Sequence, residues 1–119
     1  MTSWQRETLK VAIVDDEDLL RRALERILSG FRVHVDEVGV DVSYETTGFA
    51  TGEELLEAVA HGDGYDLMLL DLRLPGISGL DVLERLREQG RDIVTIMITA
   101  YATFETAVQA TKLGGYDFL

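Results

Sequence analysis

The chain has 119 residues, of which 46% are hydrophobic, so it can form one domain around a single core and is too short for two. Its 22 acidic residues outnumber 11 basic ones, and the net charge of −11 argues against direct nucleic-acid binding because it repels phosphate backbones. The chain contains no cysteine, which excludes disulfides, and no apolar run approaches the roughly 18 residues that a membrane span requires.

Apolar runs and helical periodicity alternate along the chain. They predict strands near residues 9–14, 42–48, 66–71, 93–98 and 116–119, and helices over 17–29, 52–60, 79–89 and 103–113. In the first helix, the residues expected to share the inward face are Leu19, Leu20, Ala23, Leu24, Ile27 and Leu28. Thr51 is expected to cap the second helix, with Glu54 three residues further on. Alternating strands and helices are typical of a parallel α/β sheet.

The join between the first helix and the second strand, residues 31–41, is unusually long for such a fold. Valines alternate through it, at positions 33 and 35 and again at 38, 40 and 42. This pattern fits either an extended arm or a longer second strand, and the sequence does not choose between them. The chain also stops at Leu119, inside the last predicted strand.

Polar residues follow three of the predicted strands. Asp15 and Asp16 end the first strand, Asp71 ends a run that is apolar throughout, and Thr99 follows the fourth strand. Ligands bind beyond the carboxyl ends of strands in open parallel sheets, so we expect these residues to lie in a ligand-binding or reactive site. Three clustered carboxylates repel one another, and a hard divalent cation such as Mg²⁺ relieves that repulsion. The pattern predicts a magnesium site.

Four short motifs, taken together, resemble the receiver domain of two-component response regulators. They are Val14-Asp15-Asp16-Glu17, Asp71 with Pro75 and Gly79 behind it, Thr99-Ala100, and the segment from Lys112 to Leu119. The resemblance covers nearly the whole chain. It implies an α/β fold, a doubly wound parallel five-stranded sheet of flavodoxin-like order 2-1-3-4-5.

The resemblance also implies that residues 1–119 are a receiver domain that is incomplete at its C-terminal end. The family has a lysine shortly after the Asp117-Phe118-Leu119 segment, followed by a last helix, and both would fall beyond Leu119. The segment from Thr99 to Leu119 is most similar to receivers of transcriptional activators that carry an ATPase module and a DNA-binding module.

A set of metal and phosphoryl contacts follows from the resemblance. Asp71 would be the phosphoacceptor, and Asp71 and Asp16 would ligate Mg²⁺ directly. Asp15 would act through water, and the backbone carbonyl of Arg73 would supply another oxygen. Thr99 would donate a hydrogen bond to a phosphoryl oxygen and act as a switch.

Phe118 would be the switch aromatic of the last strand. The implied partners are a sensor histidine kinase and an output domain in the parent chain, with no direct nucleic-acid or membrane contact. A homodimer is compatible with the family, and the expected location is cytoplasmic. The implied chemistry is at most self-phosphorylation and autodephosphorylation, so a turnover enzyme is not expected.

Two alternatives stay open at this point. Asp16-Glu17-Asp18 spells the D-x-D motif of haloacid dehalogenase-type phosphohydrolases, although Leu20 stands where that family has Thr or Val. The chain could instead be a degenerate receiver that only binds partners. The absent lysine favours the degenerate receiver, whereas the carboxylates and Thr99 argue against it.

Overall fold

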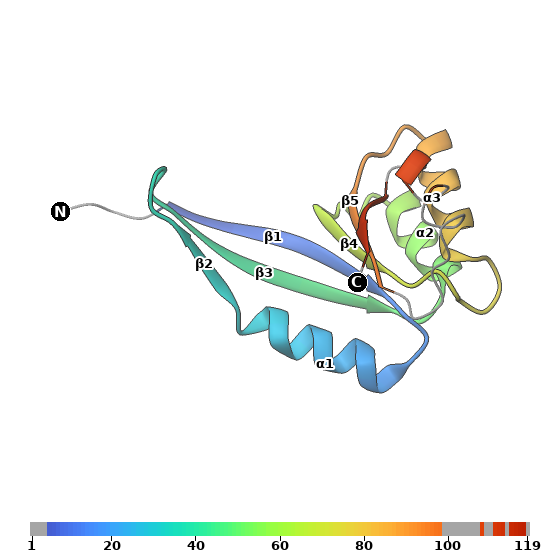
Figure 1. The fold of residues 1–119 in the computed structure, drawn as a ribbon, viewed down its shortest axis with the longest axis horizontal. Coiled ribbons are helices and arrows are strands. Elements are labelled where there is room, and N and C mark those ends of the chain that lie inside the picture. The colour runs from blue at the N-terminus through green and yellow to red at the C-terminus, as the bar shows by residue number, and fades with distance from the viewer. Residues whose placement is uncertain (1–4, 99–107, 109–110, 114, 119) are drawn as a thin grey trace.

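The computed structural model describes residues 5–98, 108, 111–113 and 115–118. The described strands are β1 (Gln5–Val14), β2 (Arg32–Val35), β3 (Val40–Phe49), β4 (Leu67–Leu70), β5 (Val94–Met97) and β6 (Gly115–Phe118). They form one six-stranded sheet of order β2-β3-β1-β4-β5-β6 (Figure 1). This sheet is the framework that positions the candidate site.

Five of the strands correspond to the five that the sequence predicts. β3, β1, β4, β5 and β6 pair in parallel, which is the predicted order 2-1-3-4-5 when the predicted strands are counted along the chain. The predicted fold class is therefore confirmed. One strand, β2, was not predicted, and it pairs antiparallel with β3 at the edge of the sheet.

The long join between the first helix and the second strand belongs to a projection of the sheet. β1 and β3 pair over their whole lengths, from Gln5 with Val40 to Val14 with Phe49, whereas β4 meets β1 only from Val11 onward. Residues 5–10, 32–35 and 40–45 thus form a three-stranded arm, which gives the molecule its longest dimension of 52 Å (Figure 1). The extended arm and the longer second strand, the two alternatives for this join, are each correct in part, since β2 adds a strand to the arm and β3 starts earlier than predicted.

Three helices lie within one residue of their predicted bounds: α1 (Asp18–Ser29), α2 (Gly52–Ala60) and α3 (Gly79–Glu88). The Thr51 hydroxyl accepts a hydrogen bond from the Glu54 amide at 3.1 Å, as predicted. Ser78 and Asp81 form a reciprocal capping box at the start of α3, which fixes the loop that follows Asp71. Most of the predicted fourth helix, 103–113, lies outside the described residues.

The main core lies between one face of the sheet and helices α2 and α3. Its buried residues are Ala12, Val14, Phe49, Leu55, Val59, Met68, Leu70, Leu72, Val82, Leu83, Leu86 and Met97. Helix α1 packs along β3 on the opposite face, the face of Val11 and Ile13 (Figure 1). No helix within the described ranges combines the length and the apolar character that crossing a bilayer requires.

The predicted inward face of α1 is wrong in part. No residue of α1 is buried, and Leu19 is 85% and Ile27 63% exposed. Leu24 and Leu28 are half-buried. The helix rests along β3 beside the arm, so only a narrow flank of its apolar face meets the sheet.

Candidate functional site

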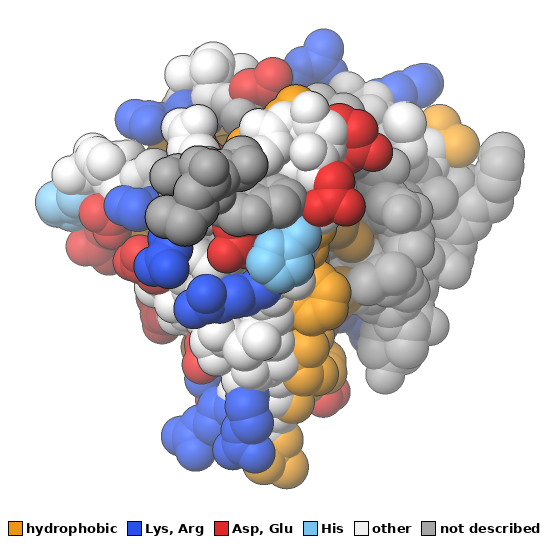
Figure 2. Space-filling view, turned by 90° about the vertical axis from the view of Figure 1, so that its left-hand side faces the viewer, with side chains coloured by type: hydrophobic (Ala, Val, Ile, Leu, Met, Phe, Trp, Pro, Cys, Tyr) orange, Lys and Arg blue, Asp and Glu red, His pale blue; other side chains and the backbone are white. Residues whose placement is uncertain are grey.

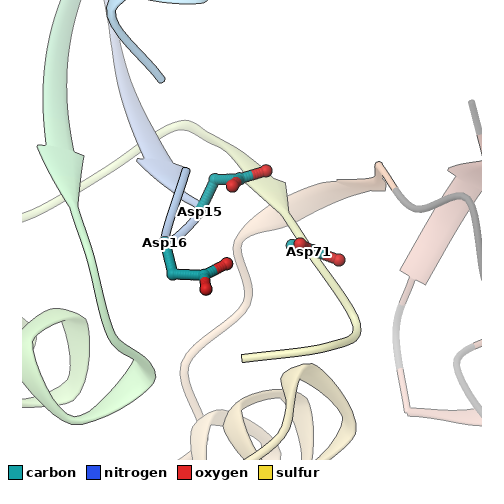
Figure 3. A group of neighbouring side chains, drawn as sticks. All are labelled: Asp15, Asp16 and Asp71. Carbon is teal, nitrogen blue, oxygen red and sulfur yellow. The ribbon is translucent and has the colours of Figure 1, made fainter. Parts of the chain in front are cut away.

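The carboxyl ends of β1 and β4 bring three acidic residues together. The Asp15 amide donates to the Phe49 carbonyl and the Asp71 amide to the Val14 carbonyl, each at 3.0 Å, so both residues continue the parallel ladder. Asp16 follows Asp15 directly, and one carboxylate oxygen from each of the three lies within 4.8 Å of the others. Figure 3 shows the three side chains at these two strand ends.

The three acidic residues differ in how deeply they are buried. Asp15 is 1% exposed, Asp71 is half-buried and Asp16 is exposed. One side of the site is therefore buried against the sheet, and the other side is open to water. A phosphoryl donor and the water ligands of an ion can both approach from the open side.

Backbone amides orient two of the carboxylates. The Glu17 amide donates to Oδ1 of Asp15 at 2.8 Å, and the Arg73 amide donates to Oδ1 of Asp71 at 3.1 Å. In both cases the donor lies two residues after the aspartate, which is the geometry of an Asx turn. Each strand thus ends in the same local turn, and each turn fixes the direction of one acid.

The pKa of the Asp15 carboxyl is raised above its usual range. Burial is the main cause, since it disfavours the charged form, and the neighbouring Asp16 carboxylate acts in the same direction. The hydrogen bond from the Glu17 amide and the Arg21 guanidinium oppose that shift without cancelling it. A cation bound among the three carboxylates would stabilise the charged form of Asp15.

One residue at the site was not identified from the sequence. Nη1 of Arg21 donates to the backbone carbonyl of Asp15 at 2.7 Å, and its Nη2 pairs with the Asp18 carboxylate. The available signal was the spacing of three between Asp18 and Arg21 at the start of a helix, which places the two side chains on one face. Nothing in that spacing indicates the contact with the end of β1.

The structure brings together three of the predicted site residues, Asp15, Asp16 and Asp71. Arg73 lies beside them and contacts Asp71 through its backbone amide. Thr99 and the side chain of Phe118 lie outside the described residues.

The donor set fits a hard divalent cation. All three side-chain ligands are carboxylates, which suit Mg²⁺ and Ca²⁺ rather than softer metals. Mg²⁺ usually keeps several waters and takes only one or two carboxylates, and the exposure of Asp16 leaves room for water.

A parallel sheet of order β3-β1-β4-β5-β6, with acidic residues at the carboxyl ends of β1 and β4, is typical of one class of protein. The chain belongs to the response regulator receiver domain family, whose model matches residues 11–119. It is thus a receiver domain of the two-component response regulator type, and nothing supports the haloacid dehalogenase alternative.

Curated relatives agree with this assignment. The chain is 36% identical over 110 residues to the response regulator protein PilR of Pseudomonas aeruginosa, and 33% identical over 109 residues to the DNA-binding transcriptional regulator NtrC of Escherichia coli. Each match covers 92% of this chain but only 22% of PilR and 21% of NtrC. The chain therefore spans about a fifth of the length of these relatives.

Solved structures show the same fold. The signal receiver domain of a putative LuxO repressor protein from Vibrio parahaemolyticus superposes with a TM-score of 0.78 and 26% identity, over 95% of this chain and 78% of that one. A CheY-like receiver domain protein from Methanospirillum hungatei gives a TM-score of 0.73 and 26% identity, over 98% of this chain and 81% of that one.

Proposed function

We propose that this receiver takes a phosphoryl group from a sensor histidine kinase onto Asp71, with Mg²⁺ held by Asp15, Asp16 and Asp71. The observation that carries the proposal is the approach of three carboxylates to within 4.8 Å at two parallel strand ends, in a chain of the receiver family. Such clustering of like charges is costly unless a cation is recruited.

The transfer is an in-line displacement at phosphorus. A carboxylate oxygen of Asp71 attacks, the new O–P bond forms, and the P–N bond to the donor histidine breaks, leaving its electron pair on the imidazole nitrogen. Bound Mg²⁺ would offset negative charge on the phosphoryl oxygens. The carboxylates of Asp15 and Asp16 lie beside that of Asp71, and the hydrogen bond from the Arg73 backbone amide keeps the nucleophile oriented.

The remaining roles come from the family. Thr99 is proposed to donate its hydroxyl to a phosphoryl oxygen, Phe118 to change position with the switch, and the Arg73 carbonyl to complete the metal site. The receiver domain is proposed to span residues 1–119 and to act in the cytoplasm. Its parent chain is proposed to carry an output domain that regulates transcription, as the name of NtrC indicates for that relative.

Phosphoryl uptake from acetyl phosphate tests the acceptor. With Mg²⁺ present, intact-mass analysis should show one added phosphoryl group on the wild type and none on Asp71→Asn. Asp66→Asn is the matched control, because Asp66 lies at the opposite end of the same strand, where it accepts from the Lys10 amide. An adduct that persists in Asp71→Asn would identify another acceptor, and a wild type without an adduct would favour a receiver that only binds partners.

Calorimetric titration tests the metal site. Asp16→Asn should weaken Mg²⁺ binding roughly tenfold or more, the scale of losing a ligand or its support. Asp63→Asn, an exposed acid on the loop before β4, should leave the affinity unchanged. Equal affinities for wild type and Asp16→Asn would remove Asp16 from the site.

A further inference from the structure

Arg21 joins the end of β1 to the start of α1. Its side chain is only 15% exposed, although arginine is seldom buried unless it is paired. Nη1 donates to the Asp15 carbonyl at 2.7 Å, and Nη2 pairs with the exposed Asp18 carboxylate. One guanidinium therefore spans the turn that carries Asp15 and Asp16.

The neighbouring strand makes room for this side chain. Gly48 lies on β3 opposite Ile13, on the face that α1 covers. A Cβ at Gly48 would overlap Oε1 of Glu25 and lie 2.9 Å from Cδ of Arg21, closer than such atoms approach in proteins. The stem of Arg21 and the Glu25 carboxylate thus share the space that a side chain on β3 would fill, so Arg21 packs against the sheet and does not simply extend into solvent.

The contact with the Asp15 carbonyl bears directly on Asp16. This carbonyl and the Asp16 amide belong to one planar peptide unit, so holding the oxygen fixes the plane from which the Asp16 side chain projects. The Asp15 carboxylate is held separately by the Glu17 amide at 2.8 Å. Asp16 is exposed, and within the described residues its carboxylate makes no hydrogen bond, so the backbone is what directs it.

We propose that Arg21 is a positioning residue of the magnesium site, whose bridge from the Asp15 carbonyl to Asp18 directs the Asp16 carboxylate toward Asp71. The inference rests on the proposed function, because it assumes that the cluster binds Mg²⁺. It assigns Arg21 no contact with the ion or with the phosphoryl group.

If Arg21 acted on Mg²⁺ binding through its charge alone, its removal would change the affinity in the opposite direction from the loss of a positioning residue. Arg21 carries a positive charge close to the cluster, and that charge repels a bound cation. If charge alone mattered, Arg21→Gln would tighten Mg²⁺ binding. If Arg21 positions the site, the same substitution weakens binding, because Asp16 loses its fixed direction.

Mg²⁺ titration by calorimetry distinguishes these cases. Arg21→Gln should weaken the affinity about tenfold, as removal of a residue supporting metal ligands typically does. Arg22→Gln is the matched control: Arg22 carries the same charge one residue on, is exposed, and makes no hydrogen bond with Asp15 or Asp18 in the described part of the chain. It should leave the affinity unchanged or slightly tighter.

Two further variants separate position from charge and from folding. Arg21→Lys keeps the charge but has no planar fork to reach both partners, so it should recover only part of the affinity. Asp18→Asn in the Arg21→Gln background should add little, because the bridge is already broken. Metal-free melting curves show whether each variant is folded at the titration temperature.

The outcomes for the wild type and the variants are distinct. A wild type that binds no Mg²⁺ overturns the proposed function and this inference with it. A wild type that binds, together with a folded Arg21→Gln that binds equally well or more tightly, overturns the inference alone. Full recovery by Arg21→Lys would also overturn it, because one hydrogen bond to the Asp15 carbonyl would then suffice without the bridge to Asp18.

Discussion

Asp15 combines nearly complete burial with a carboxyl whose pKa is raised, chiefly by that burial. A raised pKa means that the folded state holds the proton more tightly than the unfolded state does. As pH rises from 3.8, the ordinary pKa of an aspartate, toward the higher pKa of Asp15 in the folded state, the unfolded chain releases its proton first, and Asp15 makes the free energy of unfolding fall. Above the pKa of Asp15 in the folded state, the decrease in the free energy of unfolding has reached its full size and no longer changes with pH.

Asp15→Asn should therefore stabilise the metal-free protein at neutral pH while weakening Mg²⁺ binding. Its amide oxygen can still accept from the Glu17 amide, so the turn is kept. The measurement is denaturant unfolding at acid and neutral pH, without metal and with excess Mg²⁺, which should stabilise the wild type more than the variant. A variant that is less stable than the wild type at neutral pH without metal would contradict the expected penalty.

Gly79 sets how closely α3 approaches Asp71, the proposed phosphoacceptor. A Cβ at this position would overlap the Asp71 carbonyl oxygen and lie 2.9 Å from Cα of Leu72. Both neighbours are backbone, so Gly79→Ala should cost about 1–3 kcal/mol of stability and displace Asp71. Gly64→Ala is the control, because a Cβ at Gly64 meets nothing within 4 Å. Equal melting temperatures for the two variants would show that the loop yields easily.

At the scale of elements, the central strands with continuous apolar runs could be predicted best. The run Leu67–Leu70 is apolar throughout and could only be a central strand or a buried helix, and the Pro75-Gly76 turn made it too short for a helix. β2 could not be predicted, because the alternation of Val33 and Val35 defines two faces but no pairing partner. Its pairing with Val42 and Val40 depends on contacts that a period-two pattern does not encode.

The acidic cluster could be predicted for a related reason. Carboxyl ends of parallel strands meet at one edge of the sheet, so a strand order that places β1 beside β4 suffices to bring Asp15 near Asp71. The contact of Arg21 could not be predicted, because it depends on where α1 lies over Gly48. The exposure of α1 was missed since an amphipathic pattern gives the apolar face of a helix but not how much of it is covered.

The arm and the central sheet should differ in hydrogen exchange. Amides of β2 belong to an edge strand that pairs with β3 alone within the described sheet, whereas Val11–Val14 of β1 pair with β3 on one side and β4 on the other. Local opening therefore costs less in β2, and Arg32–Val35 should exchange faster than Val11–Val14. The two-sided stretch of β1 is the internal reference. Equal protection would mean that the arm opens only with the whole sheet.

At the scale of the whole molecule, the two faces of the sheet are covered unequally. Helices α2 and α3 bury a continuous core on one face, whereas α1 contributes no buried residue to the other. Figure 2 shows the result: in the lower part of the view, where α1 lies, hydrophobic side chains line one flank and Lys and Arg side chains the other. An exposed apolar stripe of this kind favours association between molecules.

Leu20 and Ile27 define that stripe, because a spacing of seven places them on one side of α1, and they are 40% and 63% exposed. We expect the sedimentation coefficient of the wild type to rise with concentration and that of the double variant Leu20→Gln/Ile27→Gln to stay constant. Neither side chain is buried, so the free energy of unfolding should change by only about 0.5 kcal/mol per site. Val38→Gln is the control, since Val38 is 67% exposed in the turn between β2 and β3, away from α1. If Val38→Gln abolished association as fully as the double variant, the contact would belong to the arm instead, and a wild type that is monomeric at every concentration would show that the stripe is too narrow to hold two molecules together.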